Sequence, residues 1–200
     1  MNKQCELFYE LQQGSDEWFD TRRSVCTSSE VGGLYAAKKG FETYLVQKEA
    51  ERYLAYMDPS FVSEAMKRGT ELEPIARDIF QKEQLLSVKE CGFVLRKDLN
   101  AGWSPDGIIC LPDDKFYAIE IKCRNVVNHY RVFKEGIDMP TYQQMQFAMA
   151  ITDIPMMYFV AYNPDFIASH QMFIQKIEIS RELQANTLRL LKIVKEKIGL

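Results

Sequence analysis

The chain has 200 residues, a hydrophobic content of 46% and a formal net charge of −3 at pH 7, which is typical of one globular domain with an apolar core. It contains no run of about 18 apolar residues, and its first residues are neither basic nor strongly apolar, so the sequence predicts neither a membrane span nor a secretion signal. We therefore expect a soluble, intracellular protein that is not secreted.

The cysteine pattern and the slight excess of acidic residues argue against several classes of protein. The five cysteines form no close CxxC pair, so neither a disulfide framework nor a zinc or iron–sulfur knuckle is expected. The pI of about 5.6 gives no general basic field of the kind that most nucleic-acid-binding proteins show. Binding of a nucleic acid would therefore need basic residues gathered on one face.

The spacing of apolar residues predicts a helical front followed by strands. The expected helices in the first part of the chain span residues 16–23, 29–37, 41–56 and 70–84. Period-two alternation then predicts strands, arranged as a meander, at residues 88–96, 101–111 and 116–123, with a turn at 112–115. The chain ends with a helix, two strands and a closing helix, expected at residues 140–151, 156–162, 170–179 and 180–198.

This order of elements predicts an α/β fold with one central mixed β-sheet flanked by helices. No repeat and no Pro-, Gly- or Ser-rich linker divides the sequence, so a single domain should span residues 1–200. Within it we expect a helical front (1–86), a sheet core (87–180) and a C-terminal helix (181–200).

The strand at residues 116–123 carries two charges among aliphatic side chains. Side chains alternate along a strand, so Glu120 and Lys122 share one face while Ile119 and Ile121 share the other. Charged groups in a buried strand are costly unless they are paired or bind a metal. This pattern therefore indicates a site rather than a packing surface.

A second carboxylate lies across the turn. The hairpin brings Asp106 level with Glu120 and Ile121, and Pro105 and Gly107 interrupt regular pairing so that the aspartate can turn inward. Two close carboxylates repel each other, and a hard divalent cation with oxygen ligands relieves that repulsion. Magnesium, with Mn²⁺ as a substitute, fits such a site and stabilises charge on a phosphodiester, while the lysine amine would hold or deprotonate a water or stabilise negative charge.

Each piece taken alone also fits an ordinary surface hairpin. Glu120 and Lys122 would then form a weak salt bridge, and Asp106 would only close a Pro-Asp-Gly turn. The order in which the pieces occur along the chain favours the metal site.

Pro105-Asp106 followed by Glu120-Ile121-Lys122 resembles the PD-(D/E)xK nuclease superfamily, whose fold is restriction-endonuclease-like. Further segments resemble the lambda-type phage alkaline exonucleases, from about residue 18 to residue 163. The matching residues are Trp18, Arg22, Thr27, Ser28, Ser29, Glu30, Gly69, Glu73, Ser104, Gly107, Cys123 and the run from Tyr142 to Gln146.

The resemblance implies roles for residues of the metal site. Asp106 and Glu120 would bind the metal together with the Ile121 carbonyl, and Lys122 would position the attacking water. Glu73 would complete the acidic group, in part through metal-bound water. Its alternative reading is a capping box, because Thr70-x-x-Glu73 is typical of a helix start with Pro74 in the first turn.

Residues outside the metal site also acquire roles from the resemblance. Gln144 would support the lysine from its helix, with a solvated glutamine as the alternative. A pocket for a terminal 5′-phosphate would be formed by Arg22, Thr27, Ser28 and Ser29. A guanidinium can bind a phosphate through two hydrogen bonds, and hydroxyls at the start of a helix add further donors. The alternative is that one serine is an N-cap and Arg22 a surface charge.

The implied activity is 5′-to-3′ exonuclease digestion of linear double-stranded DNA ends in recombination or repair. The resemblance also implies a homotrimer, a strand-annealing protein as partner, no membrane partner, and the cytoplasm or nucleus of a host as location. Two alternatives stay open. One is a structure-specific endonuclease or RNA-cutting nuclease on the same core, and the other is an inactive module that binds DNA ends.

Overall fold

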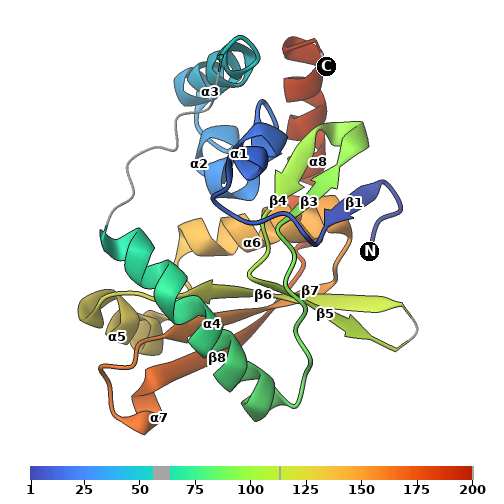
Figure 1. Ribbon diagram of the computed structural model, residues 1–200. Helices are drawn as coiled ribbons and strands as arrows, with labels where there is room; N and C mark the ends of the chain where they lie inside the picture. Colours follow the sequence, from blue (N-terminus) through green and yellow to red (C-terminus); the bar gives the residue numbers. More distant parts are fainter. Residues whose placement is uncertain (56–63, 113, 200) are drawn as a thin grey trace.

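The computed structural model describes residues 1–55, 64–112 and 114–199, and these residues contain two four-stranded sheets (Figure 1). The first sheet has the order β1-β3-β4-β2, with β1 (Cys5–Phe8), β3 (Phe93–Arg96), β4 (Ala101–Trp103) and β2 (Cys26–Thr27). The second sheet has the order β5-β6-β7-β8, with β5 (Gly107–Leu111), β6 (Lys115–Lys122), β7 (Met156–Tyr162) and β8 (Met172–Glu178). In this second sheet β6 and β7 are parallel and the other neighbours are antiparallel.

Helices surround both sheets. Their bounds are α1 (Asp16–Arg22), α2 (Val31–Leu34), α3 (Lys38–Glu51), α4 (Glu64–Gln84), α5 (Val126–Glu135), α6 (Met139–Thr152), α7 (Ala168–Gln171) and α8 (Arg181–Lys197), with short 3₁₀ turns at Ser28–Glu30 and Lys97–Leu99. Within the described residues, no helix combines the length and the apolar character needed to cross a membrane.

Helix α6 is the centre of the molecule. Its side chains from Met145 to Thr152 are all buried, and Figure 1 shows it between the two sheets with α8 packed beside it. An aspartate, Asp138, begins the helix by accepting a hydrogen bond from the Thr141 N–H. Because its second half is buried on all sides and contributes Met145, Phe147 and Met149 to one apolar cluster with residues of both sheets, α6 joins the two sheets through one shared core.

Helix α4 covers the other face of the second sheet. Its fully buried residues Ala76 and Phe80 pack with Ile119 and Ile121 of β6 in a separate apolar cluster. The two aliphatic residues of β6 therefore face α4, as the alternation predicts. Glu120 and Lys122 are left on the α6 side.

The strand predicted at residues 101–111 is interrupted, and the two parts belong to different sheets. Pro105 has no N–H to donate to a ladder. Gly107 lies so close to the rest of the chain that an added Cβ would stand 2.2 Å from a Val88 methyl. The prediction of a simple meander is therefore wrong, because the chain leaves the first sheet after Trp103 and enters the second at Gly107.

The mixed α/β class is confirmed, while several boundaries differ from those predicted. The helix expected at 29–37 is reduced to a 3₁₀ turn and the single turn α2, which contains Gly32 and Gly33. Helix α3 starts and ends earlier than expected, and the expected end at Tyr56 lies outside the described residues. Strands β1 and β2 and helices α5 and α7 were not predicted, so the front of the chain is not wholly helical.

Candidate active site

Asp106 lies at the interruption between the two sheets. The hairpin pairs Gly107 with Ile119, so the preceding aspartate stands beside Glu120 and Ile121, as predicted. Its Oδ2 accepts a hydrogen bond from the Ile121 N–H at 2.6 Å. The N–H and C=O of one residue in an extended strand point to the same edge. The Ile121 carbonyl therefore faces the edge of β6 on which Asp106 lies.

Glu120, Lys122 and Gln144 form a closed set of contacts. The Lys122 ammonium lies 2.6 Å from Glu120 Oε1, and the Glu120 side chain is 2% exposed. Gln144 reaches the pair from α6: its Nε2 donates to the same Oε1 at 2.9 Å, and its Oε1 accepts from Lys122 at 3.4 Å. The structure thus brings Gln144 to the acid and the amine, and the alternative of a solvated glutamine is wrong.

The negative charge of the acidic side chains in the site is not fully balanced by nearby positive charge. Burial raises the pKa of Asp106 well above its ordinary value, and the nearby Glu120 and Glu73 raise it further. Burial also raises the pKa of Glu73, against the opposing effect of Arg77. For Lys122, burial alone would lower the pKa, but Glu120 and Asp106 outweigh it and raise the pKa of the ammonium. Additional positive charge would therefore stabilise the site.

The donor set fits a hard divalent cation. The second oxygen of Glu120, Oε2, is buried and has no hydrogen-bond partner among the described residues, although a buried carboxylate oxygen normally has one. In the described part of the chain, no three His, Cys, Asp or Glu side chains gather closely enough to hold a metal ion. Mg²⁺ is commonly bound by one or two carboxylates together with water, and the carboxylates of Asp106 and Glu120 are donors of this kind.

Glu73 lies in the interior of α4, not at its beginning. The helix starts at Glu64, and Thr70 donates its hydroxyl hydrogen to the Met66 carbonyl one turn earlier. The capping-box reading of Thr70 and Glu73 is therefore wrong. Glu73 accepts a hydrogen bond from Arg77 at 2.6 Å. It also lies close enough to the other acids that Glu120 raises the pKa of Glu73 and Glu73 raises the pKa of Asp106.

A second group of residues surrounds Arg22. Its guanidinium stacks over the Trp18 ring at 4.0 Å, and it donates to Ser104 Oγ at 2.9 Å and to Ser29 Oγ at 3.0 Å. Burial lowers the pKa of Arg22, and among the described residues it forms no ion pair. A cation held only by hydroxyls and an aromatic ring can accept an anion, and it matches the fork of a phosphate group.

The predicted hydroxyls around Arg22 differ in their surroundings. Ser29 contacts Arg22 directly, and Thr27 lies 3.2 Å from the Ser29 hydroxyl while donating to Glu30. The Ser28 side chain is buried, and no hydrogen bond joins it to Arg22 in the part of the chain described. The structure therefore brings Arg22, Ser29 and Thr27 together and leaves Ser28 beneath the turn.

Sequence reasoning matched Ser104 to the family but gave it no role, although it connects the two groups. Its hydroxyl contacts both the Arg22 guanidinium and the Trp18 indole N–H, at 2.9 and 3.0 Å. Ser104 precedes Asp106 by two residues, so their Cα atoms can be at most about 7 Å apart. The Ser-Pro-Asp order is the signal that could have found it.

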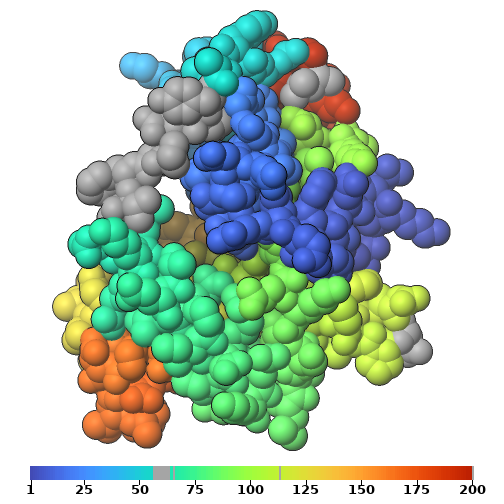
Figure 2. Space-filling model, viewed as in Figure 1, coloured from blue at the N-terminus to red at the C-terminus, as the bar shows by residue number. Residues whose placement is uncertain are grey.

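The surface beside these groups is hollowed. Figure 2 shows a depression between the N-terminal segment and the first turns of α4. A groove of about 720 Å³ is lined by Arg68 of α4 and by residues that follow Lys122 along the chain, among them Cys123, Arg124 and Arg131. The groove reaches Cys123, the residue after Lys122, but Asp106, Glu120 and Lys122 are not among its lining residues.

Comparison with known proteins identifies the family of the chain. Residues 17–155 match the YqaJ-like viral recombinase domain, and this match covers more than half of the chain. The protein therefore belongs to the YqaJ-like viral recombinase family, which confirms the resemblance to lambda-type phage exonucleases. No curated protein sequence matches the chain.

Solved structures are similar over nearly the whole chain. The alkaline exonuclease LHK-Exo from Laribacter hongkongensis has 29% identity and a TM-score of 0.77, with 92% of this chain and 95% of that chain covered. The same enzyme in complex with dAMP has 30% identity and a TM-score of 0.78 over the same shares. A phage-related exonuclease from Haemophilus somnus 129PT shares the fold, with 14% identity, a TM-score of 0.62 and coverage of 87% and 93%.

Proposed function

We propose that the protein is a metal-dependent deoxyribonuclease that digests linear duplex DNA from its 5′ ends during recombination or repair. The family match and the fold shared with an alkaline exonuclease support a nuclease that acts on DNA. The observation that carries the chemistry is the set Asp106, Glu120 and Lys122, in which one buried carboxylate oxygen has no hydrogen-bond partner within the described parts of the chain.

Asp106, Glu120 and the Ile121 carbonyl would hold Mg²⁺ or Mn²⁺, and Glu73 would contribute through water. When bound, the cation supplies positive charge that stabilises the charge developing on the phosphodiester. The chain's own acids match this need because their oxygens are hard donors and mutually repulsive.

Lys122 would orient the attacking water and stabilise negative charge on the phosphate. Its raised pKa keeps it an ammonium at neutral pH, so it acts by donating hydrogen bonds and not as a free amine. Glu120 and Gln144 hold the amine from two sides. Hydrolysis adds the water oxygen to phosphorus and breaks the bond from phosphorus to the 3′ oxygen of the terminal nucleotide, which leaves as a mononucleotide.

The Arg22 group supports a preference for 5′-phosphorylated ends. Arg22 offers a charged fork without a carboxylate partner in the described residues. Ser104 lies within about 7 Å of Asp106 along the backbone, so a phosphate bound at Arg22 would place the next phosphodiester near the acids. A relative that was solved with dAMP is consistent with release of single nucleotides.

The test is digestion of end-labelled linear duplexes that carry either a 5′-phosphate or a 5′-hydroxyl, compared with a covalently closed circle. We expect magnesium-dependent release of the 5′ label from the phosphorylated duplex and an intact circle. Cleavage of the circle would indicate an endonuclease, and cleavage of RNA alone an RNA-cutting enzyme. Binding of ends without cleavage would indicate an inactive end-binding module.

The assembly is a further part of the proposal. The family resemblance supports a homotrimer and a strand-annealing partner. Light scattering after size-exclusion chromatography tests the first, because a monomeric mass under assay conditions would contradict it.

A further inference from the structure

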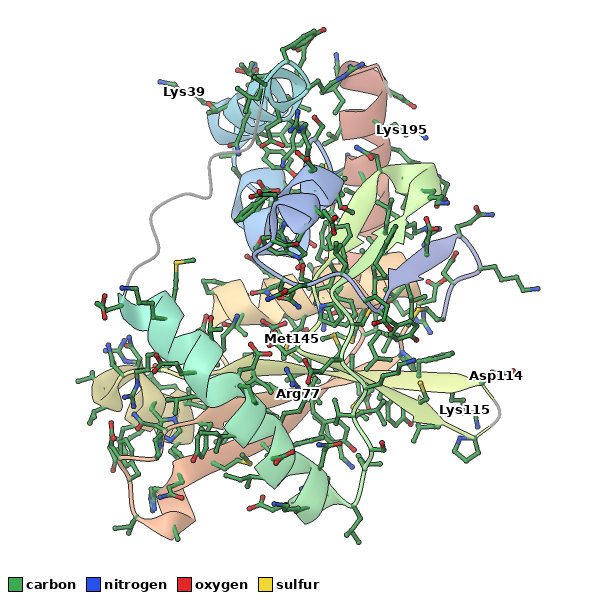
Figure 3. The ribbon with its side chains drawn as sticks, in the orientation of Figure 1. Lys39, Arg77, Asp114, Lys115, Met145 and Lys195 are labelled. Carbon is green, nitrogen blue, oxygen red and sulfur yellow. The ribbon has the colours of Figure 1, made fainter. Side chains whose placement is uncertain are left out.

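Arg77, one turn after Glu73 on α4, is bound to three separate segments of the chain. Its Nη2 donates to Glu73 Oε1 at 2.6 Å, and its Nε donates to the backbone carbonyl of Asp106 at 2.8 Å. Its Nη1 lies 2.7 Å from Glu90 Oε1. The Arg77 side chain is 9% exposed, and Figure 3 shows it near the middle of the molecule, far from the tip of the β5–β6 hairpin at Asp114 and Lys115.

The planar guanidinium sets the relative positions of two of these segments. A single rigid fork contacts the carboxylate of one acid and the backbone of another, so the distance between α4 and the Asp106 segment is fixed by one group. Lysine could not reproduce this arrangement, because its ammonium is a point charge on a flexible stem.

Helix α4 lacks one of its backbone hydrogen bonds near Glu73. Pro74 directly follows Glu73 inside α4 and cannot donate the backbone hydrogen bond that would reach the Thr70 carbonyl. The turn of helix that carries Glu73 is therefore held less firmly by its own backbone. The contact from Arg77 supplies a restraint from the side chain.

We infer that Arg77 is a positioning residue that holds Glu73 and the Asp106 backbone in register for binding of the divalent cation. The inference rests on the proposed function and adds a residue to it. Glu90 is the outer partner of Arg77 and is 75% exposed, so it belongs to the surface and not to the site.

Three variants test this role: Arg77→Lys, Arg77→Met and the matched control Glu90→Gln, which removes the outer ion pair and keeps the contacts of Arg77 with Glu73 and Asp106. Binding of Mg²⁺ is measured by isothermal titration calorimetry without DNA. Thermal unfolding is measured by circular dichroism without metal, and release of nucleotides from a 5′-phosphorylated linear duplex is measured over a range of Mg²⁺ concentrations.

We expect Arg77→Met to weaken Mg²⁺ binding and to slow cleavage by about 10- to 100-fold, the range seen for residues that orient metal ligands. Arg77→Lys should lie between this variant and the wild type, with part of its cleavage rate recovered at high Mg²⁺. Glu90→Gln should match the wild type in Mg²⁺ binding and in cleavage rate.

Three results would overturn the inference. These are wild-type Mg²⁺ binding in folded Arg77→Met, unfolding of both Arg77 variants, or equal losses in Glu90→Gln and Arg77→Lys. A wild-type protein that neither binds Mg²⁺ nor cleaves DNA would instead remove the proposed function, which keeps the two failures distinct.

Discussion

Asp106 accepts a hydrogen bond from the backbone N–H of Ile121 at 2.6 Å. Asp106 lies just before β5 begins at Gly107, so the backbone of β5 does not reach Ile121. One carboxylate oxygen therefore completes the edge of β6. The other oxygen is available to the site. Asp106 therefore has two roles: one oxygen stabilises the hairpin, and the other can take part in the site.

The two roles of Asp106 can be separated by substitution. Asp106→Asn keeps an oxygen that can accept from the Ile121 N–H, and it removes a negative charge that burial disfavours. We therefore expect the stability of this variant without metal to be unchanged or higher. Asp106→Ala leaves that N–H without a partner and should lower the free energy of unfolding by about 1–3 kcal/mol. Urea denaturation of the metal-free proteins measures both, and equal stability of the two variants would argue against the dual role.

The raised pKa of Asp106 predicts how metal-free stability depends on pH. A carboxyl whose pKa is higher in the folded state contributes stability that is present below its unfolded pKa and is lost as pH rises through the folded value. The raised pKa of Glu73 acts in the same direction. Lys122, whose folded pKa is also raised, loses its contribution only above the ordinary lysine range.

Added Mg²⁺ should therefore raise the melting temperature more at about pH 8.5 than at about pH 5.5, because only ionised carboxylates bind it. Differential scanning fluorimetry with and without Mg²⁺ measures this difference. Asp106→Asn serves as the control in which most of the increment should vanish. A shift of the same size at both pH values would contradict the assignment of these acids to a metal site.

Gln144 should affect the rate and not the binding of DNA. Gln144→Leu removes contacts to Glu120 and Lys122 but leaves their direct contact of 2.6 Å, so we expect kcat to fall by about tenfold with little change in KM. The neighbouring Gln143 makes no hydrogen bond through its side chain in the described residues, which makes Gln143→Leu a matched control. A change confined to KM would place Gln144 in DNA binding.

Arg22 should govern the discrimination between end types. Loss of its charge-assisted hydrogen bonds in Arg22→Ala should slow digestion of 5′-phosphorylated ends by about 10- to 100-fold and leave 5′-hydroxyl ends nearly unchanged. Arg23→Ala is the control, because the adjacent Arg23 pairs with Asp20 and with the Leu54 carbonyl instead. Equal losses on the two kinds of end would exclude a phosphate pocket at Arg22.

The parts of the fold that depend on local interactions could be predicted from the sequence. Helices α1, α6 and α8 follow Ser15, Asp138 and Ser180, each of which accepts a hydrogen bond from the first turn. The interruption at Pro105 and Gly107 was predicted, but the passage of the chain from the first sheet into the second was not, because the residues on both sides of it are apolar. It depends on pairing between β4 and the distant two-residue strand β2.

The same distinction applies to the site. Asp106, Glu120 and Lys122 were found because one hairpin joins them, and Gln144 because of the family resemblance. Arg77 was missed because a glutamate and an arginine four residues apart are common on exposed helices. Only the packing of α4 against the second sheet turns this pair inward, toward the carbonyl of Asp106.

The most direct test of the site is the rate at which Lys122→Met releases mononucleotides from a 5′-phosphorylated linear duplex at saturating Mg²⁺. We expect the rate to fall by about 10²- to 10⁴-fold relative to the wild type, with the folded state and the binding of duplex ends retained. A folded Lys122→Met variant that digests the duplex at nearly the wild-type rate would contradict the assignment of Asp106, Glu120 and Lys122 as the centre of hydrolysis.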